Sequence, residues 1–385
     1  MSAEETLRAR LHHATSGVSL EVPRGWPVVD DVGAVTCEAP TARADVTGRA
    51  IPARLSIEML ERHGLVPPRA LDVVVRDLVD DALAAHPHAW VLDCTPWDVR
   101  SPAGDPRVGA PRTASATGVR VDVALHDMTT PLVVTTVLVA LEAGLLRVTA
   151  SVPVAHQRSL GAEIDEALDS VLLGPVGAGL RATVAPGGAM LALPLPYASP
   201  STWLTPEALE VFVTGSHKIA ARWRPEPFAA GLVDDRGVAT PLGAFVRRAV
   251  SRPDVRATLT VCPIELVQGA GQHQEVAASP VMVVDRLDGY AVLRASPPPV
   301  RATTPWTEQR HVSVEVVDLA AAPARAAAWL GLGPGRPAEL PDGTLAVLGS
   351  VRSPAPGVRA DGAASIVSAL PGPREVWVRL LDALG

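Results

Sequence analysis

Two histidines, an aspartate and a cysteine lie close together in one segment, and such side chains can hold a metal ion. His86-Pro87-His88 is followed by Asp93 and Cys94. Structural zinc sites use recurring ligand pairs such as C-x-x-C and H-x-x-x-H, and this spacing matches none of them. Because a proline between two histidines is typical of an exposed corner between elements, we interpret the segment as surface and expect no metal.

A second group of residues could supply a nucleophile or a general base. Ser216, His217 and Lys218 place a hydroxyl beside the single lysine of the chain, and His126 with Asp127 ends a predicted strand. A serine activated by a lysine requires the two groups to meet, which side chains two residues apart do in a strand but not on a helix. These residues keep open the alternative of a hydrolase-type enzyme with a pocket between two domains. Since G-x-S-x-G, H-E-x-x-H and P-loop motifs do not occur, we expect no catalytic residue, no cofactor and no enzymatic activity.

Two glycine clusters have the composition, but not the spacing, of phosphate-binding loops. Gly174–Gly179 reads GPVGAG and Gly331–Gly335 reads GLGPG. Neither shows G-x-G-x-x-G between a strand and a helix, which is the arrangement that binds a dinucleotide. Glycine also ends helices and forms linkers, and we assign both clusters to those roles.

Tryptophan dominates the aromatic residues, with eight Trp against three Phe and two Tyr. Trp97, Trp203, Trp223 and Trp306 lie near predicted loops or element ends. Tryptophan at such positions often anchors a protein partner, and the alternative is an ordinary, partly buried tryptophan. We predict these four as partner-binding residues.

The composition indicates a folded protein and excludes several classes of function. The chain has 385 residues, of which 48% are hydrophobic and 19% charged, so it can bury the cores of two domains. The net charge is −7 and the arginines form no runs, so we expect no nucleic-acid binding. Asparagine does not occur, which excludes Asn-linked glycosylation.

The first residues and the cysteines indicate the cytoplasm. MSAEETLR carries acids where a signal peptide needs a cationic end and an apolar segment, so we expect no general export. The longest apolar run, Leu132–Leu141, has only about half the ~20 residues of a spanning helix, so we expect no membrane insertion. Cys37, Cys94 and Cys262 are widely separated and odd in number, which favours buried thiols in a reducing compartment.

The elements that must position these residues follow an α+β order in both halves. In the first half, alternation of apolar and polar residues predicts strands at 17–23, 34–38, 51–59, 89–99, 119–126, 132–141 and 145–152. Pro52 places the third of these at a sheet edge, and the strand at 119–126 is predicted to bury one face only. Helical spacing predicts helices at 70–85 and 156–173. Consecutive strands joined by hairpins imply an antiparallel sheet flanked by helices.

A change to Gly, Ala and Pro between 176 and 202 marks a linker, so the predicted domains are 1–175 and 203–385. Thr205-Pro206 and Thr240-Pro241 each combine an N-cap with a first-turn proline and predict a helix start. Further predictions are a helix at 318–330 and strands at 255–261, 281–284, 290–293, 312–317, 345–348 and 376–380. Asp288-Gly289 predicts a hairpin between the second and third of these strands. In the helix from Pro241, we expect Leu242, Phe245, Val246, Ala249 and Val250 to form one apolar face.

The first half resembles the PsbP-like family that includes the actinobacterial LpqN and LpqT lipoproteins. The resemblance rests on SLEVPRGW at 19–26, on the helix from Ala70, and on TASVPVAHQRSLGAEIDEALDSVL, a strand leading into the final helix. It implies an antiparallel sheet flanked by helices, protein binding, and no shared catalytic residues. This chain departs from those lipoproteins because it shows no signal peptide and no lipid-acceptor cysteine near its start.

Residues 203–385 are similar to the EspG family of type VII (ESX) secretion-associated chaperones of actinobacteria. The matching stretches are LTPEAL at 204–209, GLVDDRG at 231–237, and the helix from Pro241 with RPDVRATLTV after it. This resemblance implies a non-enzymatic chaperone that holds export substrates in the cytosol, and it transfers no individual binding residue. We therefore predict a cytoplasmic adaptor or chaperone with a protein partner, with the enzyme above or a structural subunit of a larger assembly as alternatives.

Overall fold

In a computed structural model, the chain divides into two compact units, Met1–Leu193 and Pro194–Gly385. The structure describes residues 8–13, 17–31, 34–40, 51–60, 71–86, 89–100, 115–127, 130–141, 144–173, 203–215, 219–263, 280–299, 311–332, 344–352 and 373–384. The predicted linker at 176–202 lies outside these residues. Each unit is described by itself.

Among the described residues of the first unit, seven strands form one antiparallel sheet. In spatial order they are β3 (Val28–Asp31), β4 (Ala34–Glu38), β5 (Arg54–Leu60), β9 (Gly144–Pro153), β8 (Thr130–Leu141), β7 (Ser115–Asp127) and β6 (Trp90–Arg100). The last four strands of this unit, β6 to β9, are consecutive in the chain, and each pairs with the next in the sheet. β1 (Arg8–His13) and β2 (Val18–Pro23) form a further antiparallel pair. Neither β1 nor β3 was predicted from the sequence pattern.

The prediction that the strand after Pro52 lies at a sheet edge is wrong. β5 begins at Arg54 and pairs with β4 on one side and with β9 on the other. Pro52 therefore precedes the first paired residue, and its missing N–H removes no hydrogen bond from the sheet.

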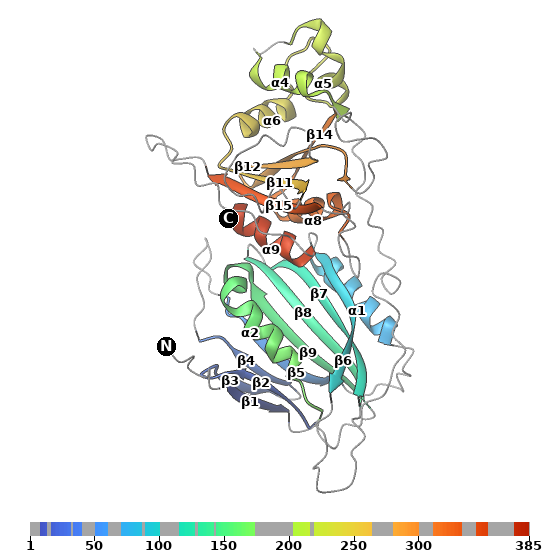
Figure 1. Ribbon diagram of the computed structural model, residues 1–385, viewed down its shortest axis with the longest axis vertical. Coiled ribbons are helices and arrows are strands. Elements are labelled where there is room, and N and C mark those ends of the chain that lie inside the picture. Colours follow the sequence, from blue (N-terminus) through green and yellow to red (C-terminus); the bar gives the residue numbers. More distant parts are fainter. Residues whose placement is uncertain are drawn as a thin grey trace. The chain divides into compact units, whose positions relative to one another are not determined.

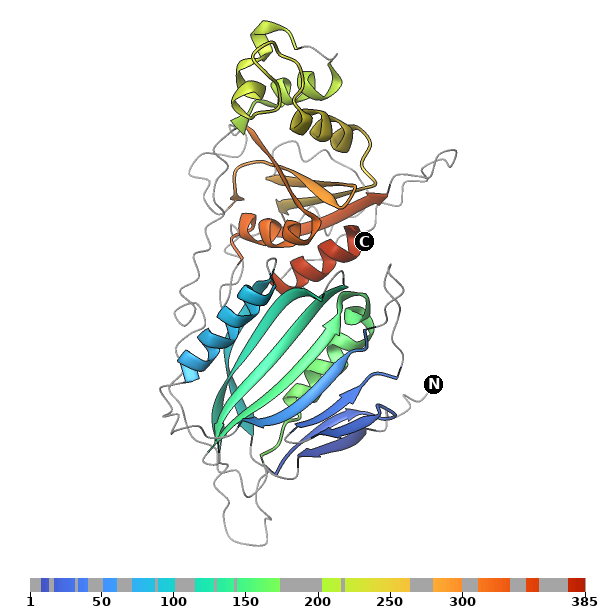
Figure 2. The same cartoon turned by 180° about the vertical axis from the view of Figure 1, so that it is seen from behind.

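Two helices cover the opposite faces of this sheet, α1 (Leu71–Ala85) and α2 (Gln157–Asp169), as Figure 1 and Figure 2 show from the two sides. Leu71, Val75 and Val79 recur every four residues, so they share one face of α1, and all three are buried against the sheet. In α2, Ile164 and Leu168 are likewise four residues apart, and they are buried against the other face of the sheet. Each face of the sheet therefore carries apolar side chains that one helix covers.

Burial on both faces corrects the expectation that the strand at 119–126 has one solvated face. Val119, Val121 and Val123 pack toward α1, as the alternation predicts. On the other face Asp122 is only 5% exposed. The polar residues of the alternation mark a buried polar cluster, which is described below.

In the second unit, six described strands form another antiparallel sheet. In spatial order they are β10 (Trp203–Leu204), β14 (Val312–Asp318), β13 (Tyr290–Ala295), β12 (Val281–Leu287), β11 (Val255–Pro263) and β15 (Thr344–Arg352). The predicted Asp288-Gly289 hairpin is confirmed: Leu287 pairs with Tyr290, and both turn residues have positive φ, 50° and 80°. Asp and Gly tolerate that backbone conformation, and such a two-residue turn matches the strand twist.

Helices α4 (Pro206–Thr214), α5 (Pro225–Ala229) and α6 (Pro241–Ser251) lie on one side of this sheet, and α8 (Ala322–Trp329) and α9 (Pro373–Leu384) lie on the other (Figure 1). Both predicted helix starts are confirmed. Thr205 Oγ1 accepts a hydrogen bond from the N–H of Ala208 at 3.3 Å, and Thr240 Oγ1 accepts one from the N–H of Gly243 at 3.0 Å. Each cap satisfies a first-turn donor that the helix itself cannot satisfy.

The strand predicted at 376–380 is wrong, because these residues belong to α9. Val376, Trp377, Leu380, Leu381 and Leu384 are all buried. Their spacing of three and four residues places them on one face of the helix. The five residues 376–380 alone are too few to distinguish the helical period from the strand period. The α+β class itself is confirmed in both units, since every named strand pair is antiparallel.

Two helical glycines give a matched test of this packing. A Cβ at Gly243 in α6 would overlap the backbone carbonyl of Leu232, whereas a Cβ at Gly161 in α2 would meet only the flexible end of Gln157 at 3.1 Å. We expect Gly243→Ala to lower the free energy of unfolding by about 3 kcal/mol, since the backbone must shift. Gly161→Ala should leave it unchanged or raise it by about 0.5–1 kcal/mol. Urea unfolding followed by circular dichroism checks both, and equal effects would contradict the packing described.

Candidate functional site

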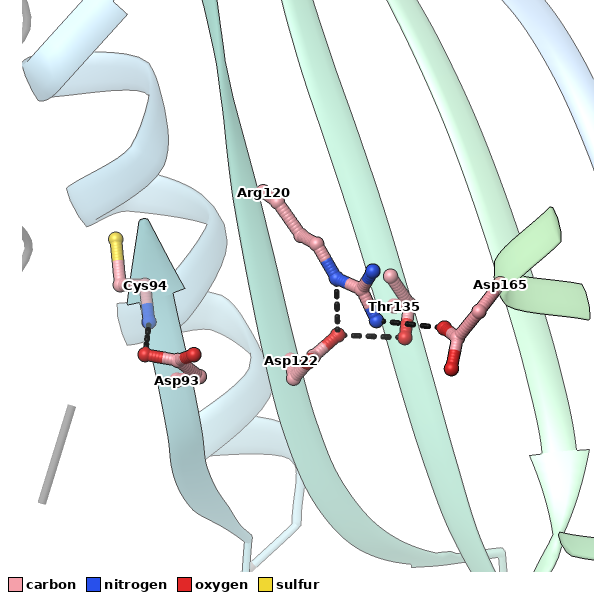
Figure 3. Close-up of polar contacts among 6 residues, drawn as sticks. All are labelled: Asp93, Cys94, Arg120, Asp122, Thr135 and Asp165. Carbon is pink, nitrogen blue, oxygen red and sulfur yellow. Dashed lines mark hydrogen bonds and ion pairs between the residues drawn. The ribbon is translucent and has the colours of Figure 1, made fainter. Parts of the chain in front are cut away.

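A buried polar cluster lies between the first sheet and α2 (Figure 3). Asp122 on β7 accepts hydrogen bonds from Thr135 Oγ1 at 2.6 Å and from Arg120 Nε at 3.3 Å. Arg120 Nη2 reaches Asp165 of α2 at 2.8 Å. Asp122 and Thr135 are 5% and 2% exposed, so the arginine links a buried carboxylate of the sheet to a half-exposed one on the helix.

The two carboxylates of this cluster keep the guanidinium of Arg120 positively charged. Burial disfavours the charged form of Arg120, but the carboxylates of Asp122 and Asp165 outweigh it, and the pKa of the guanidinium rises above its ordinary value. Arg120 therefore stays a cation at every physiological pH and cannot act as an acid or a base. The cluster joins α2 to the sheet.

The structure places Asp93 and Cys94 on opposite faces of β6, which excludes a metal site shared by both. Cys94 lies in the core under α1, while Asp93 pairs in register with Asp122 across the sheet. The N–H of Cys94 donates to Asp93 Oδ1 at 2.8 Å, as Figure 3 shows. His88 lies outside the described residues, and within the described ranges no three metal-ligating side chains come together.

Two of the histidines singled out from the sequence do meet. Nδ1 of His86, just after α1, lies 3.1 Å from the backbone carbonyl oxygen of His126 at the end of β7. Both side chains are half-buried, so His126 is not the fully solvated residue that its strand position predicted. Ser216, His217 and Lys218 lie outside the described residues, so the proposed nucleophile group is not placed.

The predicted partner-binding tryptophans fall in different units. Trp97 is half-buried on β6 and packs against the core under α2. Trp203 opens β10 and is half-buried. Trp223 ends the short helix Ala221–Trp223, packs against the core under α4 and α6, and lies 5.5 Å from the guanidinium carbon of Arg222. Trp306 lies outside the described residues, and partner binding by all four stays a prediction.

An exposed apolar surface lies along α6, and it joins two residues of the predicted apolar face to a residue of β13. Leu242 is 44% exposed and Tyr290, at the hairpin end of β13, is 47% exposed. Phe245, one turn after Leu242, stacks edge-to-face on Tyr290 with ring centroids 5.8 Å apart. We call these three residues the α6 stripe. The predicted apolar face is present: Val246, Ala249 and Val250 are buried and Phe245 packs against the same core, while Leu242, in the first turn, stays exposed. The ring of Tyr290 comes from β13, so helical spacing within 241–251 could not indicate it.

A groove of about 360 Å³ opens between α4, α6 and the same face of the second sheet. Its apolar lining comes from Leu209 and Val213 on α4, Val250 on α6, Val281 and Val283 on β12, and Val312 on β14. The charged residues of the lining are Arg294 on β13 and Glu210 on α4, and Ser296 and Thr214 add hydroxyl groups. Residues from five elements form the groove, so no local motif in the sequence could have indicated it.

Beside the groove, a fully buried aspartate is held between two arginines. Asp285 has no exposed surface; its Oδ1 accepts from Arg256 Nε at 2.5 Å and its Oδ2 accepts from Arg294 Nε at 2.8 Å. Arg256 also donates through Nη2 to the carbonyl oxygen of Val250 in α6 at 2.6 Å. The triad contains one negative and two positive charges, and it fixes both guanidinium groups in place.

No protein-family model and no curated protein matches this chain. Similar solved structures include the Saccharomyces cerevisiae Ran-binding protein Mog1p, 13% identical, with 44% of this chain and 96% of that chain covered at a TM-score of 0.28. The cyanobacterial PsbP of Synechocystis is 12% identical, with 45% and 97% covered at a TM-score of 0.27. LpqN of Mycobacterium tuberculosis, involved in cell envelope biogenesis, is 12% identical, with 44% and 91% covered at a TM-score of 0.25.

The polar cluster predicts unequal effects for its two charged partners. Arg120→Met leaves Asp122 buried without its cation, so we expect the free energy of unfolding to fall by about 3–5 kcal/mol. Asp165→Asn removes the negative charge of a half-exposed partner but keeps its acceptor oxygen, and it should cost about 1 kcal/mol or less. Urea unfolding measures the free energy of unfolding of both variants. An equal loss in the two would contradict this, because the contact of Arg120 with the helix, and not its contact with the buried carboxylate, would then supply most of the stabilisation.

The cysteines give a chemical test of burial. Cys37, Cys94 and Cys262 are free and buried. Burial, aided by nearby carboxylates, raises the pKa of Cys37 and of Cys94 from 9.0 to about 12, and burial raises the pKa of Cys262. We expect no reaction of the native protein with Ellman's reagent at pH 8, and reaction of all three thiols in concentrated urea. Rapid reaction of a native thiol would contradict this.

The same pKa shifts predict the direction of an alkaline effect on stability. The unfolded chain loses its thiol protons near pH 9.0, whereas folded Cys37 and Cys94 hold theirs to about pH 12. The unfolded state is therefore favoured progressively as the pH rises through this window. Urea midpoints measured at pH 8 and pH 11 should show a smaller alkaline loss in Cys94→Ala than in the wild type.

Proposed function

We propose that the protein is a non-enzymatic adaptor or chaperone that binds a protein partner through its second unit. The α6 stripe carries this proposal. Among the described residues, large apolar side chains are exposed at seven positions, and two of these, Leu242 and Tyr290, lie in the stripe together with Phe245. Exposed aromatic and aliphatic groups close together are typical of protein-binding surfaces.

The surroundings of the stripe support a protein partner. Arg248 and Asp288 form an exposed ion pair beside it, with side chains 58% and 62% exposed, and the guanidinium carbon of Arg248 lies 5.7 Å from the ring centroid of Phe245. An apolar centre with a charged rim is the usual anatomy of an interface, because the rim excludes water from the centre. The half-buried Trp223 belongs to the same unit and packs on the same core as α6.

The sequence resemblances support a more specific setting. The likeness of residues 203–385 to EspG-type chaperones favours a secretion substrate or a component of a type VII secretion system as the partner, in the cytoplasm of an actinobacterium. The likeness of the first half to a family without shared catalytic residues favours binding over catalysis. Within the described ranges no helix has the length and apolar character needed to cross a bilayer.

A capture experiment with matched variants tests the stripe. The tagged full chain, wild type or Leu242→Glu, is expressed in its native host, and the captured proteins are quantified by mass spectrometry. Because a buried charge opposes docking, we expect Leu242→Glu to reduce capture of the stoichiometric partner about tenfold or more. Tyr290→Ala should reduce it in the same direction.

Val73→Glu provides the control, since Val73 is also an exposed apolar helix residue, 57% exposed on α1 of the first unit. It adds the same charge and should leave capture unchanged. Equal loss with Val73→Glu, or no partner above background with the wild type, would contradict docking through the α6 stripe.

A further inference from the structure

The groove beside Asp285 has the properties of a small-molecule site. Its volume of about 360 Å³ falls within the range of ligand pockets, roughly 300–1,000 Å³. At about 30 Å³ for each water-sized group, it holds a ligand of about ten non-hydrogen atoms. Leucine and valine side chains from α4, α6, β12 and β14 form most of its wall, so the body of a ligand must be apolar.

One lining residue keeps unused hydrogen-bond donors in a fixed position. Arg294 directs Nε and Nη2 to the Oδ2 atom of Asp285, each at 2.8 Å. Among the described residues, its Nη1 has no partner, and the side chain is 20% exposed. Since Asp285 also pairs with Arg256, the triad keeps a surplus of one positive charge next to the groove.

The other polar groups of the groove lining either make hydrogen bonds within the protein or lie on its exposed surface. Ser296 Oγ accepts the N–H of Val281 at 3.0 Å and lies 3.4 Å from the carbonyl oxygen of Pro297. Thr214 Oγ1 donates to the carbonyl oxygen of Glu210 at 2.8 Å. The carboxylate of Glu210 is on the exposed surface of α4 and repels an anion there, which leaves Arg294 as the position for a negative group.

We propose that this groove binds a medium-chain aliphatic carboxylate. The alkyl chain lies against Leu209, Val213 and Val283, and the carboxylate accepts hydrogen bonds from Nη1 of Arg294. Asp285 acts as a positioning residue, because it holds the guanidinium in one orientation without touching the ligand. The groove shares no residue with the α6 stripe, so the two proposals succeed or fail independently.

Calorimetric titration of the full chain with octanoate tests the proposal. We expect binding by the wild type and weaker binding of octan-1-ol, which has the same chain but no charge. Arg294→Gln should weaken octanoate binding by about ten- to a hundredfold, the range for loss of a charged hydrogen bond. It should leave the affinity for octan-1-ol within about twofold, because the apolar wall is intact.

Arg248→Gln is the matched control, since it removes an exposed cation of the same unit that pairs with Asp288 and does not line the groove. It should keep octanoate affinity within about threefold of the wild type, a change well below the tenfold expected for a direct contact. If Arg294→Gln does not fold, Val213→Glu on α4 replaces it, adding a negative charge to the groove wall, and should abolish octanoate binding. No binding by the wild type, equal affinity for the alcohol, or equal losses in Arg248→Gln and Arg294→Gln would each overturn the proposal.

Discussion

The carboxylate of Asp285 is fully buried in the second unit, and its burial is tolerable only because two guanidinium groups pair with it. Arg256 extends the contact to the backbone of α6, and Arg294 extends it to the groove. The position of α6 over the sheet and the orientation of Arg294 therefore depend on the same carboxylate. The first unit uses a related device, in which Arg120 joins the buried Asp122 to Asp165 of α2.

In both units a sheet-borne arginine thus connects a buried aspartate to the helix that covers it. Burying an ion pair costs desolvation energy, and apolar residues of equal volume often give the same stability or more. It also has directional geometry, which apolar packing lacks, because a guanidinium satisfies a carboxylate only from particular directions. The helices are held at one orientation over sheets whose apolar faces would otherwise permit several.

The sequence allowed the α+β class and most elements to be predicted because the relevant patterns are local. Alternation at 119–126, helical spacing at 70–85 and the caps at Thr205 and Thr240 all lie within a few neighbouring residues. The failures have a different origin. The window 376–380 was too short to show the helical period of α9, and the position of β5 depended on strands that lie far away in the sequence. The groove and the triad could not be predicted, since Leu209, Val283 and Arg294 come from separate segments and carry no motif.

The hairpin turn at Asp288-Gly289 limits how the second unit can vary among related chains. Side chains on a strand alternate between faces, so the two-residue turn places Tyr290, Val292 and Arg294 on the α6 side. One inserted residue that shifted the pairing would turn Tyr290 away from Phe245 and Arg294 away from Asp285 at once. The turn can therefore accept other residues that adopt positive φ, but a change in its length would remove an exposed contact and a buried ion pair together.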